Sequence, residues 1–573
     1  MIGIIFLISQ VWSKAYDNFT QEKSHNDTAY CIAYDAIDDA YIVVGHTTPG
    51  PIGNNNDILV TKIKVSDGSV LWSKAYAFPC PMSNEHGRSV IVDYVDKETT
   101  YYVVTGYATP GFSGSPVDTA DIIVFKIAKD GMLVWGFLYS GMFEQMLLND
   151  YAYSITNTGG SYLVAGNVEP APCGGQSDAL VMSVNSLNGA VNWVWVYGAM
   201  MYGYAHTDDY LYSIIEDSTM IPCQSFVVAG KTGNPQIPFS PLVFKGINLN
   251  GNNLQGLCNY PILAGQNKCA YNIKNDHQPG YILTGDIDTT ILVMKLNPNL
   301  TVGWGGKCRT YTIPMMANSR CIQPTSDSNY VFTGSANPGI PGPFDLLMTK
   351  IDPTGALIWS RVLTGCPATW MNFDDYGQYI IEYPNSFYAS VGYTQWPAQA
   401  WFPTNLLVAK VDANGYISCP LSSDTCLGDV ETIVDSPEVF IDTSGIEQAI
   451  RMDTLPIVSA DVYVRDTLIC GLSVGVEEEQ IGLLSGVYSM PNPSLSKTVI
   501  HYTLATNSKV SIAIYDLAGR AVCTLVDKSM NAGKHSISWD GKDTAGKKVS
   551  PGIYFYKICT ASGTKVQKAI RIR

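Results

Sequence analysis

Alternating hydrophobic and polar positions recur along most of the chain in units that predict β-hairpins. In the clearest unit, Asp345–Val362, the alternating run Leu346–Ile351 meets the turn Pro353–Gly355 before a second run that carries Trp359. Two alternating runs joined by a Pro/Gly turn are a strong sequence signal for a hairpin. Matching units lie at Asp57–Lys74, Asp121–Trp135 and Asp178–Trp193, and weaker copies lie at Pro241–Leu254, Thr290–Trp304 and Asn405–Ile417.

A second pattern lies between the hairpins: a short strand is followed by an apolar strand that begins with an aromatic residue and ends in Gly. The short strands include Ala152–Ile155, Leu211–Ile214 and Ala270–Ile273. The apolar strands are Tyr41–Gly45, Tyr102–Gly106, Tyr162–Gly166, Phe226–Gly230, Tyr281–Gly285, Tyr330–Gly334 and Tyr388–Gly392. Each period spans roughly 50 to 65 residues and holds about four strands, which is the sequence signature of a β-propeller.

The two ends of this array complement each other. Val11–Tyr16 matches the second hairpin strand at Leu71–Tyr76, whereas the last copy breaks off at Tyr416–Cys419. Pairing of Val11–Tyr16 with Asn405–Val411 would complete the last unit and remove the exposed sheet edges. The sequence therefore predicts an all-β chain whose residues 11–419 close as a seven-bladed β-propeller.

Residues 1–10 are apolar but short, and they lack the basic segment of a signal peptide. They are either a buried strand or the remnant of a signal peptide that starts upstream, and the repeat match beginning at Val11 favours the remnant. No other segment has the apolar length of a transmembrane helix.

Two further regions follow the array. Residues 420–488 are acidic and carry short alternating runs such as Asp461–Asp466, which predicts an extended acidic linker with short strands. Residues 489–573 predict a small antiparallel β-sandwich. Its predicted strands are Val499–Leu504, Val510–Tyr515, His535–Trp539, Gly552–Ile558 and Ala569–Arg573.

Composition narrows the class of protein. The 573 residues include 51 Gly and 31 Pro, and their formal charge of −15 argues against a nucleic-acid partner. Charge reverses at the end of the chain: from Lys497 onward, thirteen Lys and Arg face four Asp. The fourteen Cys form no C-x-x-C pairs, and export would permit disulfides, for which Cys419, Cys426 and Cys470 are candidates with several possible pairings.

Residues 11–419 resemble the secreted bacterial repeat propellers whose copies read D-x-x-x-x-K-x-D-x-x-G-x-x-x-W. The last 80 or so residues resemble the FlgD-type immunoglobulin-like domain, through Pro491–Pro493, Ile514–Arg520 and Ala532–Ile558. That domain commonly serves as the C-terminal (Por) sorting domain of type IX secretion substrates. The resemblance implies export to the outer-membrane surface, or release, in a Gram-negative-type bacterium, with the secretion machinery as a partner.

No catalytic, cofactor-binding or metal-binding residue is predicted. The histidines (His25, His46, His86, His206, His277, His501 and His535) lack ligand spacing and are expected to be mostly solvated near blade loops. Gly111–Pro116 is no nucleophile elbow because no helix pattern follows it. Asp208–Asp209 and Asp374–Asp375 are paired carboxylates that are more simply explained as turn residues.

Two recurring residues of the hairpins are expected to be structural. The recurring Asp (Asp57, Asp121, Asp178 and Asp345) lacks calcium-loop spacing and suggests a hydrogen bond between blades. The recurring Trp (Trp12, Trp72, Trp135, Trp193, Trp304 and Trp359) predicts core packing between blades.

The favoured function is a monomeric binding or scaffold module that takes a protein or glycan ligand on one loop face of the propeller. The alternative is a secreted enzyme acting on glycans. A quinoprotein is a third possibility, against which the lack of a vicinal Cys pair counts.

Overall fold

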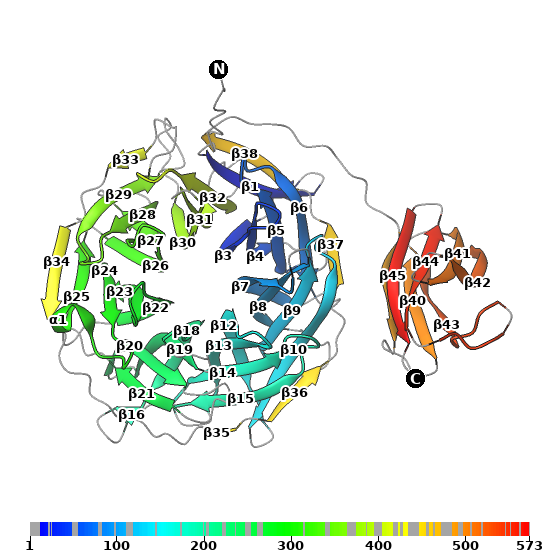
Figure 1. Cartoon of the computed structure of the whole chain (residues 1–573), viewed down its shortest axis with the longest axis horizontal. Coiled ribbons are helices and arrows are strands. Elements are labelled where there is room, and N and C mark those ends of the chain that lie inside the picture. The colour runs from blue at the N-terminus through cyan, green and yellow to red at the C-terminus, as the bar shows by residue number, and fades with distance from the viewer. Residues whose placement is uncertain are drawn as a thin grey trace. The chain divides into compact units, whose positions relative to one another are not determined.

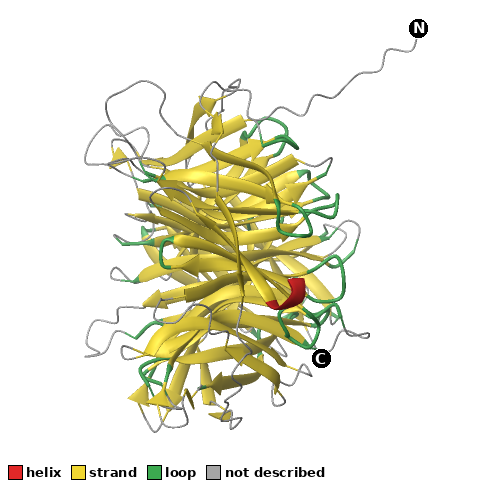
Figure 2. Cartoon of the chain, turned by 90° about the vertical axis from the view of Figure 1, so that its left-hand side faces the viewer, coloured by secondary structure: helices red, strands yellow, loops and turns green. Residues whose placement is uncertain are grey.

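Antiparallel β-strands form nearly all of the regular structure, and the one helix among the described residues, α1 (Gly303–Gly306), has four residues (Figures 1 and 2). The computed structural model describes residues 12–571 except 21–22, 25, 49–54, 78–82, 97–98, 110–118, 144–145, 172–174, 199, 202–204, 220–224, 235–236, 247–253, 260–267, 313–315, 338–343, 364–373, 385–386, 395–403, 416–421, 425–427, 434–445, 448, 454–457, 462–463, 471–483, 491–496, 505–506, 517–519, 545, 551 and 561–562. The chain divides into two compact units, Met1–Val476 and Glu477–Arg573. The predicted signal remnant, residues 1–10, lies outside the described residues.

The described part of the first unit holds seven antiparallel sheets that are built on the same four-strand plan. Sheet 1 comprises β3 (Asn26–Asp35), β4 (Ala40–Thr48), β5 (Asp57–Lys64) and β6 (Val70–Ala77). Sheet 2 comprises β7 (Asn84–Tyr94), β8 (Thr100–Thr109), β9 (Asp121–Ala128) and β10 (Leu133–Phe143). Sheet 3 comprises β12 (Asn149–Asn157), β13 (Ser161–Glu169), β14 (Asp178–Asn185) and β15 (Val191–Tyr197).

The remaining four sheets repeat this plan. Sheet 4 comprises β18 (Asp208–Glu216), β19 (Phe226–Asn234), β20 (Ile237–Gly246) and β21 (Leu254–Asn259). Sheet 5 comprises β22 (Lys268–Asn275), β23 (Tyr281–Ile287), β24 (Thr290–Leu296) and β25 (Lys307–Thr312). Sheet 6 comprises β26 (Met316–Pro324), β27 (Tyr330–Asn337), β28 (Asp345–Ile351) and β29 (Leu357–Leu363). Sheet 7 comprises β30 (Asp375–Tyr383), β31 (Phe387–Thr394), β32 (Asn405–Val411) and β1 (Trp12–Thr20). The short strands β2 (Lys23–Ser24), β11 (Met146–Leu147), β16 (Met200–Met201) and β17 (Ala205–His206) lie outside the plan.

The first strand of each sheet is its innermost strand (Figure 1). Neighbouring inner strands contact each other in a closed cycle that runs through β3, β7, β12, β18, β22, β26 and β30 and returns to β3. The N-terminal strand β1 completes sheet 7 by pairing with β32, where Trp12 lies opposite Lys410 and Tyr16 opposite Leu406. This pairing confirms the one predicted between residues 11–16 and 405–411, and it joins the two ends of the array.

A row of short strands runs around the outside of the ring (Figure 1). These strands are β33 (Ser422–Asp424), β34 (Gly428–Ile433), β35 (Ile446–Glu447), β36 (Ala449–Asp453), β37 (Val458–Asp461) and β38 (Val464–Cys470). They pair in turn with the outer strands of sheets 6, 5, 3, 2, 1 and 7. The acidic segment therefore adds a further strand to six outer edges, which shields those edges from pairing with other chains.

The recurring tryptophans lie where one sheet meets the turn of the next. Trp359 is buried, whereas Trp72, Trp135, Trp193 and Trp304 are only partly buried, so the prediction of core packing holds fully for Trp359 alone. The indole Nε1 of Trp72, Trp304 and Trp359 donates to the carbonyl oxygen of Lys129, Pro353 and Ala413, at 3.0, 2.9 and 3.1 Å. The side chain of Trp12 lies outside those the structure describes.

The second unit has two antiparallel sheets around a core of its own. One sheet comprises β39 (Leu484–Met490), β40 (Thr498–Leu504) and β43 (Gly533–Trp539). The other comprises β42 (Ala521–Met530), β41 (Ser508–Asp516), β44 (Gly552–Thr560) and β45 (Gly563–Arg571). Ile500, Ile512, Trp539 and Tyr556 are among its buried core residues. The predicted strands of this region all coincide with observed ones, while β39 and β42 were not predicted. None of the described helices has the length and apolarity needed to cross a membrane.

Candidate functional site

Every inner strand of the ring contains one β-bulge at the same position. In β3 the register shifts between Ala29 and Cys31, which leaves Tyr30 as the extra residue. The equivalent extra residues of the other six inner strands are Arg88, Tyr153, Tyr212, Tyr271, Arg320 and Gln378. A bulge locally redirects side chains and is common beside functional sites. We call these seven residues the collar.

The bulges explain the glycine that ends each predicted apolar strand. A Cβ atom added to Gly45 would lie 1.6 Å from the carbonyl oxygen of Thr28, which precedes the bulge in β3. The six equivalent glycines face the same obstruction from a backbone carbonyl at 1.6 to 2.0 Å: Gly106, Gly166, Gly230, Gly285, Gly334 and Gly392. Any side chain there would force the two strands apart, so the repeated Gly is a requirement of the collar geometry.

The collar residues contact one another from sheet to sheet. The rings of Tyr153 and Tyr212 have their centroids 5.4 Å apart, and those of Tyr212 and Tyr271 are also 5.4 Å apart. The guanidinium carbon atoms of Arg88 and Arg320 lie 4.0 Å from the ring centroids of Tyr30 and Tyr271, respectively. Aromatic and cationic side chains thus form a continuous series over sheets 1 to 6, and each of them remains partly exposed.

Uncharged side chains surround Arg88 in the described part of the chain. It donates from Nη2 to the Tyr107 hydroxyl at 2.8 Å, and its guanidinium also lies near the Tyr153 ring, at 6.0 Å. Burial, with a smaller contribution from the charge of Arg88, lowers the pKa of His86 to about 4. Burial, with smaller contributions from His86 and Arg88, lowers the pKa of His46 to about 3. Both imidazoles are therefore uncharged at neutral pH. No carboxylate pairs with Arg88 within the described part of the chain.

Arg320 differs because an acid accompanies it. Asp286 accepts a hydrogen bond from the backbone N–H of Ser319 at 3.0 Å and interacts electrostatically with Arg320. Burial raises the pKa of Asp286 to about 6, although Arg320 opposes the rise. Lys231 lies near another part of the collar, with Nζ 4.5 Å from the ring centroid of Tyr210 and 6.0 Å from that of Tyr212.

On one side of the collar, a hydrogen bond joins two inner strands that are not neighbours in the ring. Lys274 Nζ of β22 donates to the hydroxyl of Tyr379 on β30 at 2.8 Å, and so reaches past the intervening strand β26. Both residues follow the bulge in their strands. The opposite side of the collar, where the inner strands begin, carries His86, Tyr151 and Tyr210.

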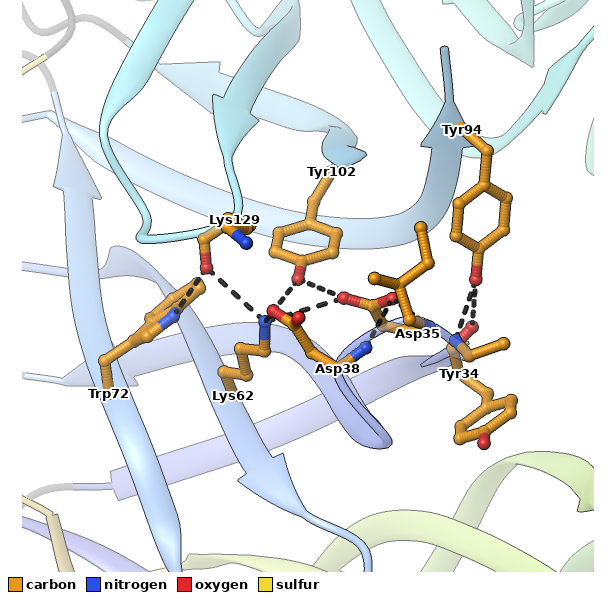
Figure 3. A network of polar contacts seen from close by, with 10 residues as sticks. Tyr34, Asp35, Asp38, Lys62, Trp72, Tyr94, Tyr102 and Lys129 are labelled. Atoms are coloured by element: carbon orange, nitrogen blue, oxygen red, sulfur yellow. Dashed lines mark hydrogen bonds and ion pairs between the residues drawn. The ribbon is translucent and has the colours of Figure 1, made fainter. Parts of the chain in front are cut away.

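A separate network joins neighbouring sheets near the hairpin turns (Figure 3). Lys62 donates to the Tyr102 hydroxyl at 2.6 Å, and Tyr102 donates to Asp35 at 2.6 Å. Equivalent Lys–Tyr pairs are Lys126 with Tyr162, Lys245 with Tyr281, Lys295 with Tyr330, and Lys350 with Tyr388. All of these groups are tied to the next sheet, so the network is structural.

The paired carboxylates considered from the sequence also join sheets. Asp208 and Asp374 accept hydrogen bonds from the backbone N–H groups of Gln176 and Phe344, at 2.7 and 2.8 Å. Asn26, Asn84 and Asn149 accept equivalent bonds from the neighbouring sheet. A position that carries Asn as often as Asp needs an acceptor and not a charge.

The recurring hairpin Asp lies against an acid of the next inner strand. Burial raises the pKa of Asp150 to about 8, and Asp121 adds to the rise. Burial likewise raises the pKa of Asp345 to about 8, with further contributions from Asp375 and Asp374. These carboxyls therefore hold protons near neutral pH, which is the expected behaviour of two buried acids that share one interface.

The histidines and cysteines divide between described and undescribed positions. His46 and His86 were expected to be solvated, but their rings meet on the inner face at a centroid distance of 4.8 Å, which corrects that expectation. Cys31, Cys269, Cys308, Cys321, Cys523 and Cys559 are free thiols. The disulfide candidates Cys419 and Cys426, the side chain of Cys470, His25, the side chain of His206 and the loop Gly111–Pro116 fall outside what the structure describes.

Sequence reasoning missed the collar, although its signal was present. The short strands Ala152–Ile155, Leu211–Ile214 and Ala270–Ile273 each place Tyr between two residues whose side chains are turned inward between sheets. A regular strand would bury alternate residues, whereas a bulge shifts that alternation by one. The repeated Tyr before Ser or Asn marked the bulge, but only the register shows which way the Tyr faces.

Comparison with known proteins identifies one part of the chain. Residues 495–564 match the FlgD Ig-like domain. A search of curated protein sequences found no significant match.

Several solved structures show weak likeness. PorZ, a surface component of the type IX secretion system of Porphyromonas gingivalis, is 10% identical over 95% of this chain and 81% of its own, with a TM-score of 0.19. Latent PorU of the same organism is 11% identical over 79% of this chain and 31% of its own, with a TM-score of 0.15. A β-fructofuranosidase from Schwanniomyces occidentalis is 9% identical over 75% of this chain and 99% of its own, with a TM-score of 0.25. At such values these likenesses carry no argument about activity.

Proposed function

We propose that this protein is an exported surface protein in which a seven-bladed β-propeller, residues 11–419, binds a ligand at its axis. The observation that carries the proposal is the collar. Six consecutive sheets present Tyr or Arg at one equivalent bulge, and these side chains are partly exposed and in contact with one another. Clusters of aromatic groups with a few well-placed polar groups are typical of ligand sites.

Strand pairing supports the propeller assignment. A closed cycle of inner strands and the completion of sheet 7 by β1 are the features that distinguish a propeller from an open stack of sheets. The acidic segment 420–488 would then link the propeller to the last domain while bracing the outer edges of its blades. We take the protein to be a monomer on this basis, because covered edges disfavour association by strand pairing.

We further propose that residues 489–573 act as a type IX sorting domain that engages the secretion machinery. The FlgD Ig-like match at residues 495–564 supports this, as does the excess of thirteen Lys and Arg over four Asp from Lys497 onward. A charge reversal confined to one domain suits a separate binding task, since net charge governs association more than fold. The location would be the outer-membrane surface or the medium of a Gram-negative-type bacterium.

The second candidate is a secreted enzyme acting on glycans, and Asp286 is the observation that favours it. A carboxyl with a pKa of about 6 beside Tyr271 and Arg320 has the protonation behaviour of a general acid or base. The collar supplies no second carboxyl with a complementary shift within the described residues, so binding without turnover remains the first proposal.

One experiment separates the two candidates. The full-length chain is applied to an array of neutral and acidic oligosaccharides, and each ligand that binds is then incubated with the protein and analysed by chromatography. The binding proposal predicts retention of intact ligand. Release of shortened products that stops in Asp286→Asn would establish the enzyme, and the absence of any bound glycan would remove glycans as ligands of the propeller.

A further inference from the structure

The collar contains one positive charge, Arg88, that no carboxylate among the described residues balances. Arg88 is contacted by the rings of Tyr30 and Tyr107 and by uncharged His86. Burial keeps the pKa of Tyr30 above its usual value even though Arg88 opposes the rise, so the phenol cannot supply a counter-charge. Charges inside proteins are normally paired, because an unpaired charge away from bulk water is costly.

Three buried nitrogen atoms, one in Arg88 and two in neighbouring histidines, have no hydrogen-bond partner among the described residues. They are Nε of Arg88 and Nδ1 of His46 and of His86. These atoms come from two strands that pack against each other, β4 of sheet 1 and β7 of sheet 2, and Arg88 is the bulge residue of β7. The site therefore has both an uncompensated charge and unused hydrogen-bonding capacity.

We propose that Arg88 binds the carboxylate of an acidic sugar, whose ring lies against the tyrosines of the collar. This inference rests on the proposed binding function and names the class of its ligand. A guanidinium offers a planar pair of N–H donors that matches a carboxylate, and the match is strongest where water is scarce.

Arg320 shows what the same position looks like when it is already paired. It occupies the equivalent bulge of sheet 6 and stacks on Tyr271 as Arg88 stacks on Tyr30, but Asp286 supplies a carboxylate beside it. The chain thus supplies its own acid at one collar arginine and leaves the other for a ligand. This contrast makes Arg320 an internal control for Arg88.

The tyrosines indicate a sugar as the carrier of the carboxylate. The Tyr153 ring centroid lies 6.0 Å from the Arg88 guanidinium carbon, and Tyr153 begins a run of neighbouring tilted rings through Tyr212 to Tyr271. A tyrosine has an apolar face and a polar tip, and a pyranose ring likewise has an apolar C–H face and a rim of hydroxyls. A polymer of dense negative charge is disfavoured, because the protein carries a net charge of −15 and would repel it.

The geometry also gives a direction of approach. The Lys274–Tyr379 bond crosses the inner face on the side of the collar where the inner strands end. The ligand therefore reaches Arg88 from the side where these strands begin, past His86 and Tyr151. Lys274 is kept away from the carboxylate by its own bond to Tyr379.

The test uses the full-length protein and calorimetric titration with an otherwise neutral oligosaccharide that ends in a single glucuronic acid. We expect the neutral methyl ester of the same oligosaccharide, and the corresponding glucose oligosaccharide, to bind at least tenfold more weakly, which corresponds to about 1.4 kcal/mol. This arm needs no mutation and so cannot fail through misfolding. Equal affinity for the charged and esterified ligands would overturn the proposal.

Variants then locate the site. Arg88→Gln should abolish the preference for the free acid, whereas Arg320→Gln should retain it, with circular dichroism spectra checked for both. Arg88→Lys, which keeps the charge without the planar fork, should show an intermediate preference if Arg88→Gln fails to fold. A preference that survives at Arg88→Gln and disappears at Arg320→Gln would overturn the assignment to Arg88. Tight binding of neutral glycans alone would overturn this inference while leaving the binding function intact.

Discussion

Lys62 of one sheet donates a hydrogen bond to the hydroxyl of Tyr102 in the next sheet, over 2.6 Å. Tyr102 in turn donates to Asp35, whose carboxylate lies 3.5 Å from the same ammonium group. The three side chains form a buried triad across the interface, in which each polar group contacts the other two. The Lys of the repeated hairpin motif is therefore a connector between sheets.

The triad is lost as a unit where sheet 3 meets sheet 4. The hairpin position of the Lys is Ser183, the position of the Tyr is Phe226, and Trp193 stacks on that Phe at a centroid distance of 6.2 Å. A buried Lys without its acid and phenol would be an unpaired charge, and a lone buried Tyr hydroxyl would also lack a partner. Replacement of both the Lys and the Tyr at this interface therefore avoids these costs.

The triad gives the first prediction. Lys126→Met should lower the free energy of unfolding of the first unit by about 3–5 kcal/mol, because it leaves the Asp93 carboxylate buried without its cation. Tyr162→Phe removes one hydrogen-bonding group and should cost about 1 kcal/mol. The exposed Lys64→Met is the control and should change the value by less than about 0.5 kcal/mol. Urea unfolding measures all three, and a Lys126 variant as stable as the control would contradict the account.

The second prediction concerns the glycines opposite the bulges. Gly166→Ala places a methyl group 1.7 Å from the carbonyl oxygen of Tyr151, so it should destabilise the protein by about 1–3 kcal/mol or more. Gly160→Ala is the matched control on the same hairpin, since nothing lies within 4 Å of its added Cβ. Thermal unfolding compares the two. Equal melting temperatures would mean that the bulge does not press on Gly166.

How far the sequence could predict this architecture depends on the element. The apolar strands that end at Gly45 or Gly166 were predictable because alternation and turn chemistry act locally. The direction of the Tyr153 side chain was not predictable, because an extra residue reverses the alternation and only the register of the pairing with β13 shows which way the Tyr faces. The short edge strands such as β35, with two residues, carry too little pattern to show which sheet they join. The pairing of Trp12 with Lys410 was predictable because the last repeat lacked its fourth strand and the chain began with a segment that matches that strand.

The third prediction is a pH dependence of stability. Asp150 and Asp345 have a pKa of about 8 in the folded chain, against an ordinary value of about 3.9. The folded chain thus holds these protons more tightly than the unfolded chain, and stability present at acidic pH is lost as the pH rises towards 8. His46 and His86 act in the opposite sense, but only below about pH 6.5, where unfolded imidazoles take up protons.

Between pH 7 and 8 the unfolded imidazoles are mostly uncharged. Lys410, whose pKa burial lowers to about 8, acts there in the opposite sense, so comparison with a variant isolates the carboxyl. The free energy of unfolding should fall there by up to about 1.4 kcal/mol per pH unit for each protonated carboxyl. Asp345→Asn should reduce that slope, whereas Asp130→Asn, at an exposed turn, should leave it unchanged. Melting temperatures across this range measure the effect, and a slope that Asp345→Asn does not alter would show that this group ionises normally.

The fourth prediction concerns destination. Deletion of Gly552–Arg573 removes β44 and β45 from the second unit and should leave the protein in the periplasm of its native host. The full-length chain should reach the surface or the medium. Both versions are expressed with the same export signal. Fractionation followed by immunoblotting compares them, and equal amounts at the surface would refute the sorting role.

A ligand bound at the axis of the ring would cover the collar tyrosines, and hydroxyl-radical footprinting measures that cover. The full-length chain is oxidised by hydroxyl radicals with and without a trisaccharide that ends in a single glucuronic acid, and the modified residues are identified by mass spectrometry. The account predicts protection of Tyr153, Tyr212 and Tyr271, with Tyr515 of the second unit unchanged as the internal reference. Protection confined to residues on the outer strands of the ring, with the three collar tyrosines oxidised as before, would contradict it.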